Sequence, residues 1–277
     1  PRFPTTRYQG SKRKIIMELA TVFDRLSFNT ALDLYSGSGM VTLLMRYMGK
    51  QVDSNDFQLF NQAVSRLFLK STTASLQDLH YELDLPSLLE VSDVKHQRLV
   101  EQHYAGIFFT GNENDEIDRF CQNLGNEPTL RRDLYVYAVG QALLKKRPYN
   151  LFHRANLCMR KRDVKRSFGN AVTWETSILD HALSAISELR NFPFPNVPSK
   201  GRTYGQNTAD LTPLPDNYDL VYLDPPYLNS RGAGVDYSDF YSFLEGLCDY
   251  SLFTQGEETY PHRPIQKKSS RWQRTSL

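Results

Sequence analysis

The chain has 277 residues, of which 40% are hydrophobic, and its formal net charge is +2. Three cysteines lie far apart without metal-ligand spacing, which argues against a disulfide framework and favours a reducing cytoplasm. No run reaches the roughly 18 apolar residues that a membrane span needs, and the basic start lacks the apolar core of a signal peptide. We therefore expect a soluble protein of the cytoplasm rather than a secreted or membrane protein.

A strand, a glycine turn and a helix are predicted from residue 31 onward. Residues 31–35 form a short apolar run, small residues follow at 36–39, and 40–48 is an apolar stretch of helix-forming residues. Glycines in such a turn let backbone N–H groups approach a ligand, and the helix N-terminus behind them favours negative charge. The alternative is an ordinary strand–turn–helix in an enzyme that binds something else.

A second strand, predicted at 51–56, carries an acid at its carboxyl end. Asp56 lies seventeen residues beyond Gly39, and residues 57–70 return to helical spacing. An acid in this place accepts hydrogen bonds from ribose hydroxyls in nucleoside-binding α/β sheets. Together with the glycine turn, it indicates a nucleoside cofactor.

Between about residues 71 and 200 the pattern changes to polar segments that alternate with short helical stretches. The clearest helices are predicted at 130–146 and 178–190, and the proline-rich segment 191–201 is predicted to be a connector. The coarse outline is therefore an α/β core whose two halves are separated by a long, mainly helical insert.

The insert contains a strongly basic stretch. From Lys145 to Arg166, nine Lys or Arg residues accompany one acid, Asp163, which gives +8 in 22 residues. Such a surplus attracts the phosphate backbone of nucleic acid, although a solvated basic face is the alternative. Arg154 and Asn156 are candidates for contacts with base edges, because Arg and Asn can pair bidentately with guanine and adenine. The cations expected to contact DNA are Lys145, Lys146, Arg147, Arg154, Arg160, Lys161, Arg162, Lys165 and Arg166.

A buried strand of the parallel type is predicted at 218–224 and is followed at once by Asp224-Pro225-Pro226-Tyr227. Two prolines hold the backbone extended, so the Asp224 carboxylate and the Pro225 carbonyl can lie side by side. Both groups are acceptors and suit an amino group with two N–H donors, and Tyr227 offers a face on which a base can stack. The alternative is a strand terminator with a surface tyrosine. A helix is predicted at 239–250.

The order of these motifs resembles that of the Dam-type (D12 class) DNA adenine methyltransferases, and the similarity runs from about Thr6 to Arg263. The motifs that carry it are Tyr8-Gln-Gly-Ser-Lys12, Asp33-x-x-x-Gly37-x-Gly39, Asn55-Asp56, a long insert and Asp224-Pro-Pro-Tyr227. The resemblance implies the α arrangement, in which the target recognition domain lies between the cofactor half and the catalytic half.

The fold class expected from the resemblance is α/β. A Rossmann-like, S-adenosylmethionine-dependent methyltransferase core is expected to be formed by residues 1–70 and 201–277, and residues 71–200 are expected to be the inserted, mainly helical recognition domain.

The resemblance also implies a set of residues around S-adenosylmethionine and no metal. Tyr8 and Lys12 would border its methionine end, and Asp56 would hold the ribose. Asp210 would contact the cofactor adenine, although it can also be a turn residue before prolines. The cofactor-binding residues so implied are Tyr8, Lys12, Asp33, Ser36, Gly37, Gly39, Asp56 and Asp210.

The activity implied is methyl transfer to N6 of an adenine flipped out of double-stranded DNA, with Asp224, Pro225, Pro226 and Tyr227 as catalytic residues. We expect the protein to be a monomer of prokaryotic or phage origin. Its expected role is that of the modification enzyme that accompanies a cognate restriction endonuclease. Cytosine-N4 methylation uses the same acceptor geometry and is an alternative, although Asp at 224 favours adenine. A truncated, non-catalytic DNA-binding protein is the alternative from another class.

The chain departs from this family after the helix predicted at 239–250. Family members continue with strands that complete the sheet, whereas residues 258–277 are polar, basic and not strand-like. A truncated product, a frameshifted product or a sequence whose remainder is missing would explain the difference. We therefore expect a sheet with an exposed edge and an exposed apolar face.

Overall fold

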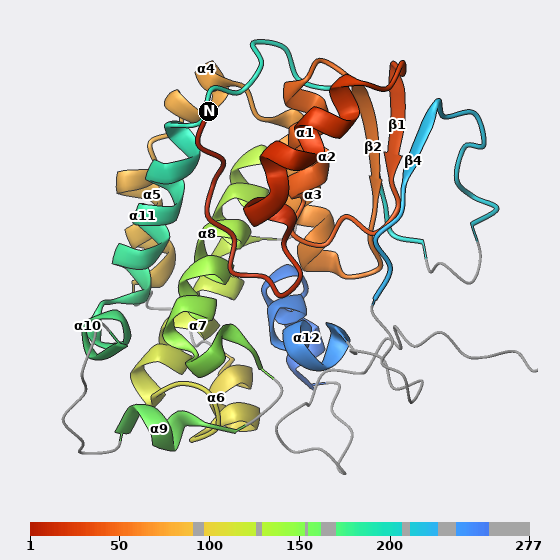
Figure 1. The fold of residues 1–277 in the computed structure, drawn as a ribbon. Coiled ribbons are helices and arrows are strands. Elements are labelled where there is room, and N and C mark those ends of the chain that lie inside the picture. The colour runs from red at the N-terminus through yellow and green to blue at the C-terminus, as the bar shows by residue number, and fades with distance from the viewer. Residues whose placement is uncertain are drawn as a thin grey trace, which may run out of the picture.

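The computed structural model describes residues 1–90, 97–125, 129–152, 155–161, 170–206, 211–226 and 237–254. These residues form an α/β structure in which helices pack beside a four-stranded sheet (Figure 1). The strands are β1 (Thr30–Asp33), β2 (Gln51–Asn55), β3 (Thr203–Tyr204) and β4 (Leu220–Tyr222). Their order in the sheet is β3-β2-β1-β4, and every pair is parallel.

The α-helices are α1 (Ile16–Asp24), α2 (Met40–Tyr47), α3 (Leu59–Lys70), α4 (Thr73–Gln77), α5 (Tyr81–Leu89), α6 (Leu99–Tyr104), α7 (Gly111–Leu124), α8 (Leu130–Lys146), α9 (Leu157–Lys161), α10 (Asn170–Glu175), α11 (Ile178–Arg190) and α12 (Tyr237–Cys248). Three short 3₁₀ segments are η1 (Lys12–Ile15), η2 (Pro148–Asn150) and η3 (Tyr250–Thr254). Among the described helices, none is long and apolar enough to cross a membrane.

The three strands predicted from the sequence are present as β1, β2 and β4, and the sequence analysis missed the two-residue strand β3. Parallel strands bring their carboxyl ends to one edge of the sheet. Asp33 at the end of β1 pairs in register with Ser54 of β2 and with Tyr222 of β4. The glycine turn, the Asn55-Asp56 segment and Asp224 therefore leave the sheet at the same edge.

The turn between β1 and α2 needs glycine at two positions. Gly37 has φ +48°, and a Cβ there would lie 3.2 Å from Cε1 of Tyr8. Gly39 has φ +69°, and a Cβ there would lie 2.9 Å from Cδ2 of Phe68. Both backbone conformations are ones that residues with a side chain rarely adopt. The two glycines thus let the turn pack closely between the N-terminal segment and α3.

The helices of the predicted insert share one hydrophobic core with the sheet half. Helix α8 runs through the middle of the molecule and packs on α3 and α11 (Figure 1). Gly140 of α8 lies so close to Phe60 of α3 that a Cβ at this position would overlap the phenyl ring. Beside it, Arg66 of α3 donates two hydrogen bonds, of 3.0 and 2.8 Å, to the carboxylate of Asp133. The boundaries of a recognition domain at 71 and 200 stay a prediction.

Strand β4 lies at the end of the described sheet, and its apolar side chains are only partly covered. Val221 is 45% exposed, and Leu223, just beyond the strand, is 61% exposed. The prediction of a buried strand at 218–224 is therefore corrected, because β4 lies at one end of the described sheet and has a neighbouring described strand on one side only. The exposed edge expected from the end of the sequence stays a prediction.

Replacing Gly140 by Ala should destabilise the protein by about 1–3 kcal/mol, because the added methyl group forces α8 away from the Phe60 ring. Urea denaturation measures the loss. Gly111→Ala is the control, since the nearest atoms to a Cβ there are 3.8 Å away and φ is ordinary. Equal stability of both variants would show that α3 and α8 do not pack this closely.

Candidate active site

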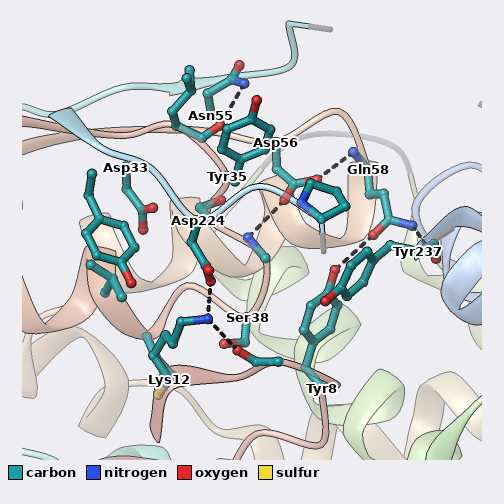
Figure 2. Close-up of a pocket in the computed structure, with 18 of the residues that line it drawn as sticks. Tyr8, Lys12, Asp33, Tyr35, Ser38, Asn55, Asp56, Gln58, Asp224 and Tyr237 are labelled. Carbon is teal, nitrogen blue, oxygen red and sulfur yellow. Dashed lines mark hydrogen bonds and ion pairs between the residues drawn. The ribbon is translucent and has the colours of Figure 1, made fainter. Parts of the chain in front are cut away.

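A pocket opens at the carboxyl edge of the sheet, where the motifs predicted from the sequence meet (Figure 2). Its walls come from the N-terminal segment, the glycine turn, the segment between β2 and α3, and the residues after β4. The predicted site residues that line it are Tyr8, Lys12, Asp33, Ser36, Gly37, Asp56, Asp224 and Pro226.

The carboxylate of Asp56 joins two of these walls. One oxygen, Oδ2, accepts a hydrogen bond of 2.9 Å from the backbone N–H of Gly37. The other, Oδ1, accepts one of 2.9 Å from the N–H of Gln58, the residue that precedes α3. Burial raises the pKa of Asp56, and these two hydrogen bonds act against the rise. Each oxygen has a second lone pair, so Asp56 can still accept hydrogen bonds from a ligand hydroxyl.

Asp33 is a buried acid with one unused oxygen. It is 1% exposed, and the Thr42 hydroxyl donates a 2.7 Å hydrogen bond to Oδ2. Oδ1 is buried and has no hydrogen-bond partner among the described residues. Burial raises the pKa of Asp33 to about 7, and the charges of Asp56 and Asp224 contribute to the rise. A ligand that brings a donor or a positive charge to this wall would offset the cost of burying the carboxylate.

The carboxylate of Asp224 forms an ion pair with Lys12 across the pocket (Figure 2). Lys12 also donates a hydrogen bond of 3.2 Å to the backbone carbonyl of Gly10. Among the described residues that line the pocket, Lys12 is the single cation, whereas three residues, Asp33, Asp56 and Asp224, carry carboxylates. The pocket is therefore suited to a ligand that carries positive charge together with one anionic group for Lys12.

The rings of Tyr8 and Tyr237 line another side of the pocket, and a third ring, that of Tyr241, packs on Tyr8. The Tyr8 ring stacks on Tyr241 with 4.3 Å between ring centroids, and Tyr237 lies parallel to Tyr8 at 5.7 Å. The Tyr8 hydroxyl donates a 3.3 Å hydrogen bond to Gln58 Oε1. The sequence analysis missed Gln58, Gln206 and Tyr237 as pocket residues. Tyr237 was missed because nothing in the pattern separates a pocket aromatic from the packing face of α12.

Other predicted site residues lie away from the pocket or outside the described residues. Gly39 packs on Phe68 behind the turn and is not part of the pocket lining that the structure describes. Pro225 is exposed beside Asp224. Tyr227 and Asp210 lie outside the described residues.

Three cations that we expected to contact DNA are engaged inside the fold. Lys146 is 2% exposed and lies 3.0 Å from Glu113, and Arg160 donates hydrogen bonds of 2.9 and 2.7 Å to the same carboxylate. Arg147 is 1% exposed, donates to the backbone carbonyls of Phe108 and Leu151, and has its guanidinium 4.4 Å from the Phe108 ring centroid. The prediction of phosphate contacts for these three residues is corrected, because their charges serve internal packing.

The other residues that we expected to contact DNA differ in exposure, and four of them lie outside the described residues. Lys145 is half-buried and Lys161 is exposed, so both can reach a partner. Asn156 is buried, which does not fit the contact with a base edge that we expected of it. The others lie outside the described residues, and they are Arg154, Arg162, Lys165 and Arg166.

Comparison with known families gives one match. The model of a family described as D12 class N6 adenine-specific DNA methyltransferase matches residues 8–245 of this chain. The matched range covers most of the sequence and contains every motif around the pocket, from Tyr8 to the Asp224 segment. Neither the curated proteins nor the solved structures gave a match.

Asp33→Asn should stabilise the ligand-free protein at high pH. The raised pKa means that the stability contributed by protonated Asp33 is complete below about pH 4 and is lost as the pH rises through about 7. Asparagine carries no charge to bury and still accepts from Thr42. Urea denaturation between pH 5 and 8 should therefore show a gap between variant and wild type that widens with pH. If the difference in unfolding free energy between variant and wild type stays constant with pH, the Asp33 carboxylate is in contact with water.

Glu113→Gln should destabilise the protein by about 3–5 kcal/mol, because it leaves two buried cations without a carboxylate. Burial alone would raise the pKa of Glu113, but hydrogen bonds from Arg160 and Thr110 and the two cationic charges lower it to about 2. The contribution is present above pH 4.5 and is lost as the pH falls through 2, which thermal unfolding can follow.

The control for Glu113 is Asp115→Asn on the same helix, where Asp115 forms an exposed ion pair with Arg98. Exposed pairs contribute about 0–1 kcal/mol, so this variant should unfold almost like the wild type. A loss below 1 kcal/mol in Glu113→Gln would mean that water reaches Lys146 and Arg160. Phosphate contacts by these residues would then be restored as a hypothesis.

Proposed function

Because the chain belongs to the D12 class N6 adenine-specific DNA methyltransferase family, and so acts as an adenine-N6 DNA methyltransferase, we propose that its methyl donor is S-adenosylmethionine, bound in the pocket at the carboxyl edge of the sheet. The observation that carries the proposal is the meeting of Asp33, Asp56 and Asp224 with Lys12 around one pocket. S-Adenosylmethionine has two positive groups and one carboxylate, and this charge pattern complements the wall residues.

Each wall has a proposed role in holding the cofactor. Asp56 accepts hydrogen bonds from the ribose hydroxyls, as acids after a second strand do in nucleoside-binding sheets. Lys12 holds the carboxylate, since it is the single cation among the described lining residues. The unused oxygen of Asp33 supports this fit, because a buried acceptor without a partner is costly unless a ligand donates to it.

When bound, S-adenosylmethionine supplies an activated methyl group on its sulfonium, so the protein contributes mainly alignment and electrostatics. We propose that the Asp224 carboxylate and the Pro225 carbonyl accept the two hydrogens of the adenine amino group. This orients the nitrogen lone pair toward the methyl donor and stabilises the positive charge that develops on the nitrogen. Asp224 has to share Lys12 with the cofactor carboxylate, or release it, to take up this role.

Access to the target atom requires the adenine to leave the duplex, so we propose base flipping into the side of the pocket that Asp224 and Pro226 line. Residues 71–200 are proposed to recognise the double-stranded target, with Lys145 and Lys161 as the described residues that could contact phosphate.

A role as the modification enzyme of a restriction–modification system is a further proposal. It predicts that methylated DNA resists an endonuclease of the same site. The family match favours adenine over cytosine-N4 methylation, and a catalytic protein over a DNA-binding protein alone.

Asp224→Ala should lower the rate of methyl transfer at least about 100-fold, because the variant loses an acceptor that acts on the reacting amino group. Labelled S-adenosylmethionine and mixed-sequence DNA, followed by nucleoside analysis, measure the transfer and identify the base. Affinity for S-adenosylhomocysteine should stay within a few-fold. The control is Asp216→Asn in the exposed segment before β4. Wild-type turnover in Asp224→Ala, or methyl on cytosine, would contradict the proposed function.

A further inference from the structure

The N-terminus of α3 is capped by a residue from the other end of the chain. Gln58, at the N-cap, makes no side-chain capping bond, and the first turn of α3 contains no acid. The backbone N–H groups of Leu59 and Phe60 instead donate to Glu245, at 2.9 Å to Oε2 and 3.0 Å to Oε1. Unsatisfied N–H groups and the helix dipole make this end a favourable place for a carboxylate. Glu245, a residue of α12, thus caps the N-terminus of α3.

The same helix end also holds Asp56. The N–H of Gln58 donates to Asp56 Oδ1, so Asp56 and Glu245 divide three successive amides between them. The first turn of α3 is therefore a rigid link between the two carboxylates. If Glu245 is removed, the amides of this turn lose their partners, and the anchor of Asp56 loses its fixed position.

The face of α12 that carries Glu245 also contacts the N-terminal segment, which lines the pocket. Tyr241 lies four residues before Glu245, on the same side of the helix. Its hydroxyl accepts a 2.6 Å hydrogen bond from the N–H of Gln9, and its ring stacks on Tyr8. Glu245 is 7% exposed and Tyr241 1%, so both contacts are shielded from water. Helix α12 in this way joins the N-terminal segment to the start of α3.

We propose that Glu245 is a positioning residue for the cofactor site, which acts by fixing the first turn of α3 and through it the Asp56 carboxylate. The inference rests on the proposed function, because it takes Asp56 to hold the ribose of S-adenosylmethionine. Helix α12 is the next described element after the Asp224 segment, so the same contact ties the helix that follows the catalytic residues to the wall that holds the cofactor.

A double-mutant cycle tests this assignment through binding rather than turnover. The dissociation constant of S-adenosylhomocysteine is measured by calorimetry for wild type, Glu245→Ala, Asp56→Asn and the double variant. Glu245→Ala should weaken binding about tenfold in the wild-type background. In the Asp56→Asn background the same change should weaken binding less than about twofold, because the group through which Glu245 acts is already altered. Equal effects in both backgrounds would overturn the proposal.

Loss of stability alone is separated by a matched control. Ser177 caps α11, away from the pocket, by accepting a 2.9 Å hydrogen bond from the N–H of Asp180. Ser177→Ala should lower the unfolding temperature but leave the dissociation constant unchanged. If it weakens binding as Glu245→Ala does, the Glu245 effect is general destabilisation and the proposal fails.

A second variant serves if Glu245→Ala does not fold. Glu245→Gln keeps one acceptor for the two amides and should give an intermediate loss of affinity, again non-additive with Asp56→Asn. Should the wild type itself bind no S-adenosylhomocysteine, the proposed function fails and takes this inference with it. Tight binding by the wild type with an additive cycle refutes the positioning role alone.

Discussion

The hydrogen bonds that Asp56 accepts from Gly37 and Gln58 are the interaction on which the pocket depends. Gly37 belongs to the turn after β1 and Gln58 to the start of α3, so a single carboxylate fixes two walls that leave the sheet from different strands. Gly37 has a positive φ that residues with a side chain rarely adopt, and any side chain there would meet Tyr8. The shape of the turn, the start of α3 and the seat of the N-terminal segment are therefore set together.

The pocket gathers like charges at the expense of the folded state. Asp33 and Asp56 are both buried, both have a raised pKa, and Asp224 adds a third carboxylate to the same edge. Lys12 balances only part of this charge through its ion pair with Asp224. Buried carboxylates lower the stability of the fold, and a cationic ligand would stabilise them. This kind of conflict between stability and local structure is typical of functional sites.

The sequence predicted the sheet half well because its signals are local. The strands at 31–35, 51–56 and 218–224, and the acids in or after them, can be recognised without knowing what packs on them. Glu245 could not be recognised in this way, since its contact with Leu59 spans 186 residues and depends on how α12 meets α3. Strand β3 has two residues and no pattern of its own.

The DNA contacts predicted from the basic stretch at 145–166 were partly wrong for a related reason. A run of positive charge in a sequence does not show which side chains the fold buries, and the carboxylate that neutralises Lys146 and Arg160 lies on a different helix, at Glu113. Charge density alone therefore overestimated the surface offered to DNA. Among the cations of this stretch that the structure describes, Lys161 is exposed and Lys145 is half-buried.

The close contact between Gly140 and Phe60 has a consequence for engineering. A recognition region that shared no core with the rest could be exchanged between related enzymes as a cassette to change the target sequence. Here α8 is buried against α3, and Arg66 and Asp133 pair across the same contact. A transplant of residues 71–200, the predicted recognition domain, would have to bring a matching α3 surface with it. If that prediction holds, specificity is better altered one exposed side chain at a time.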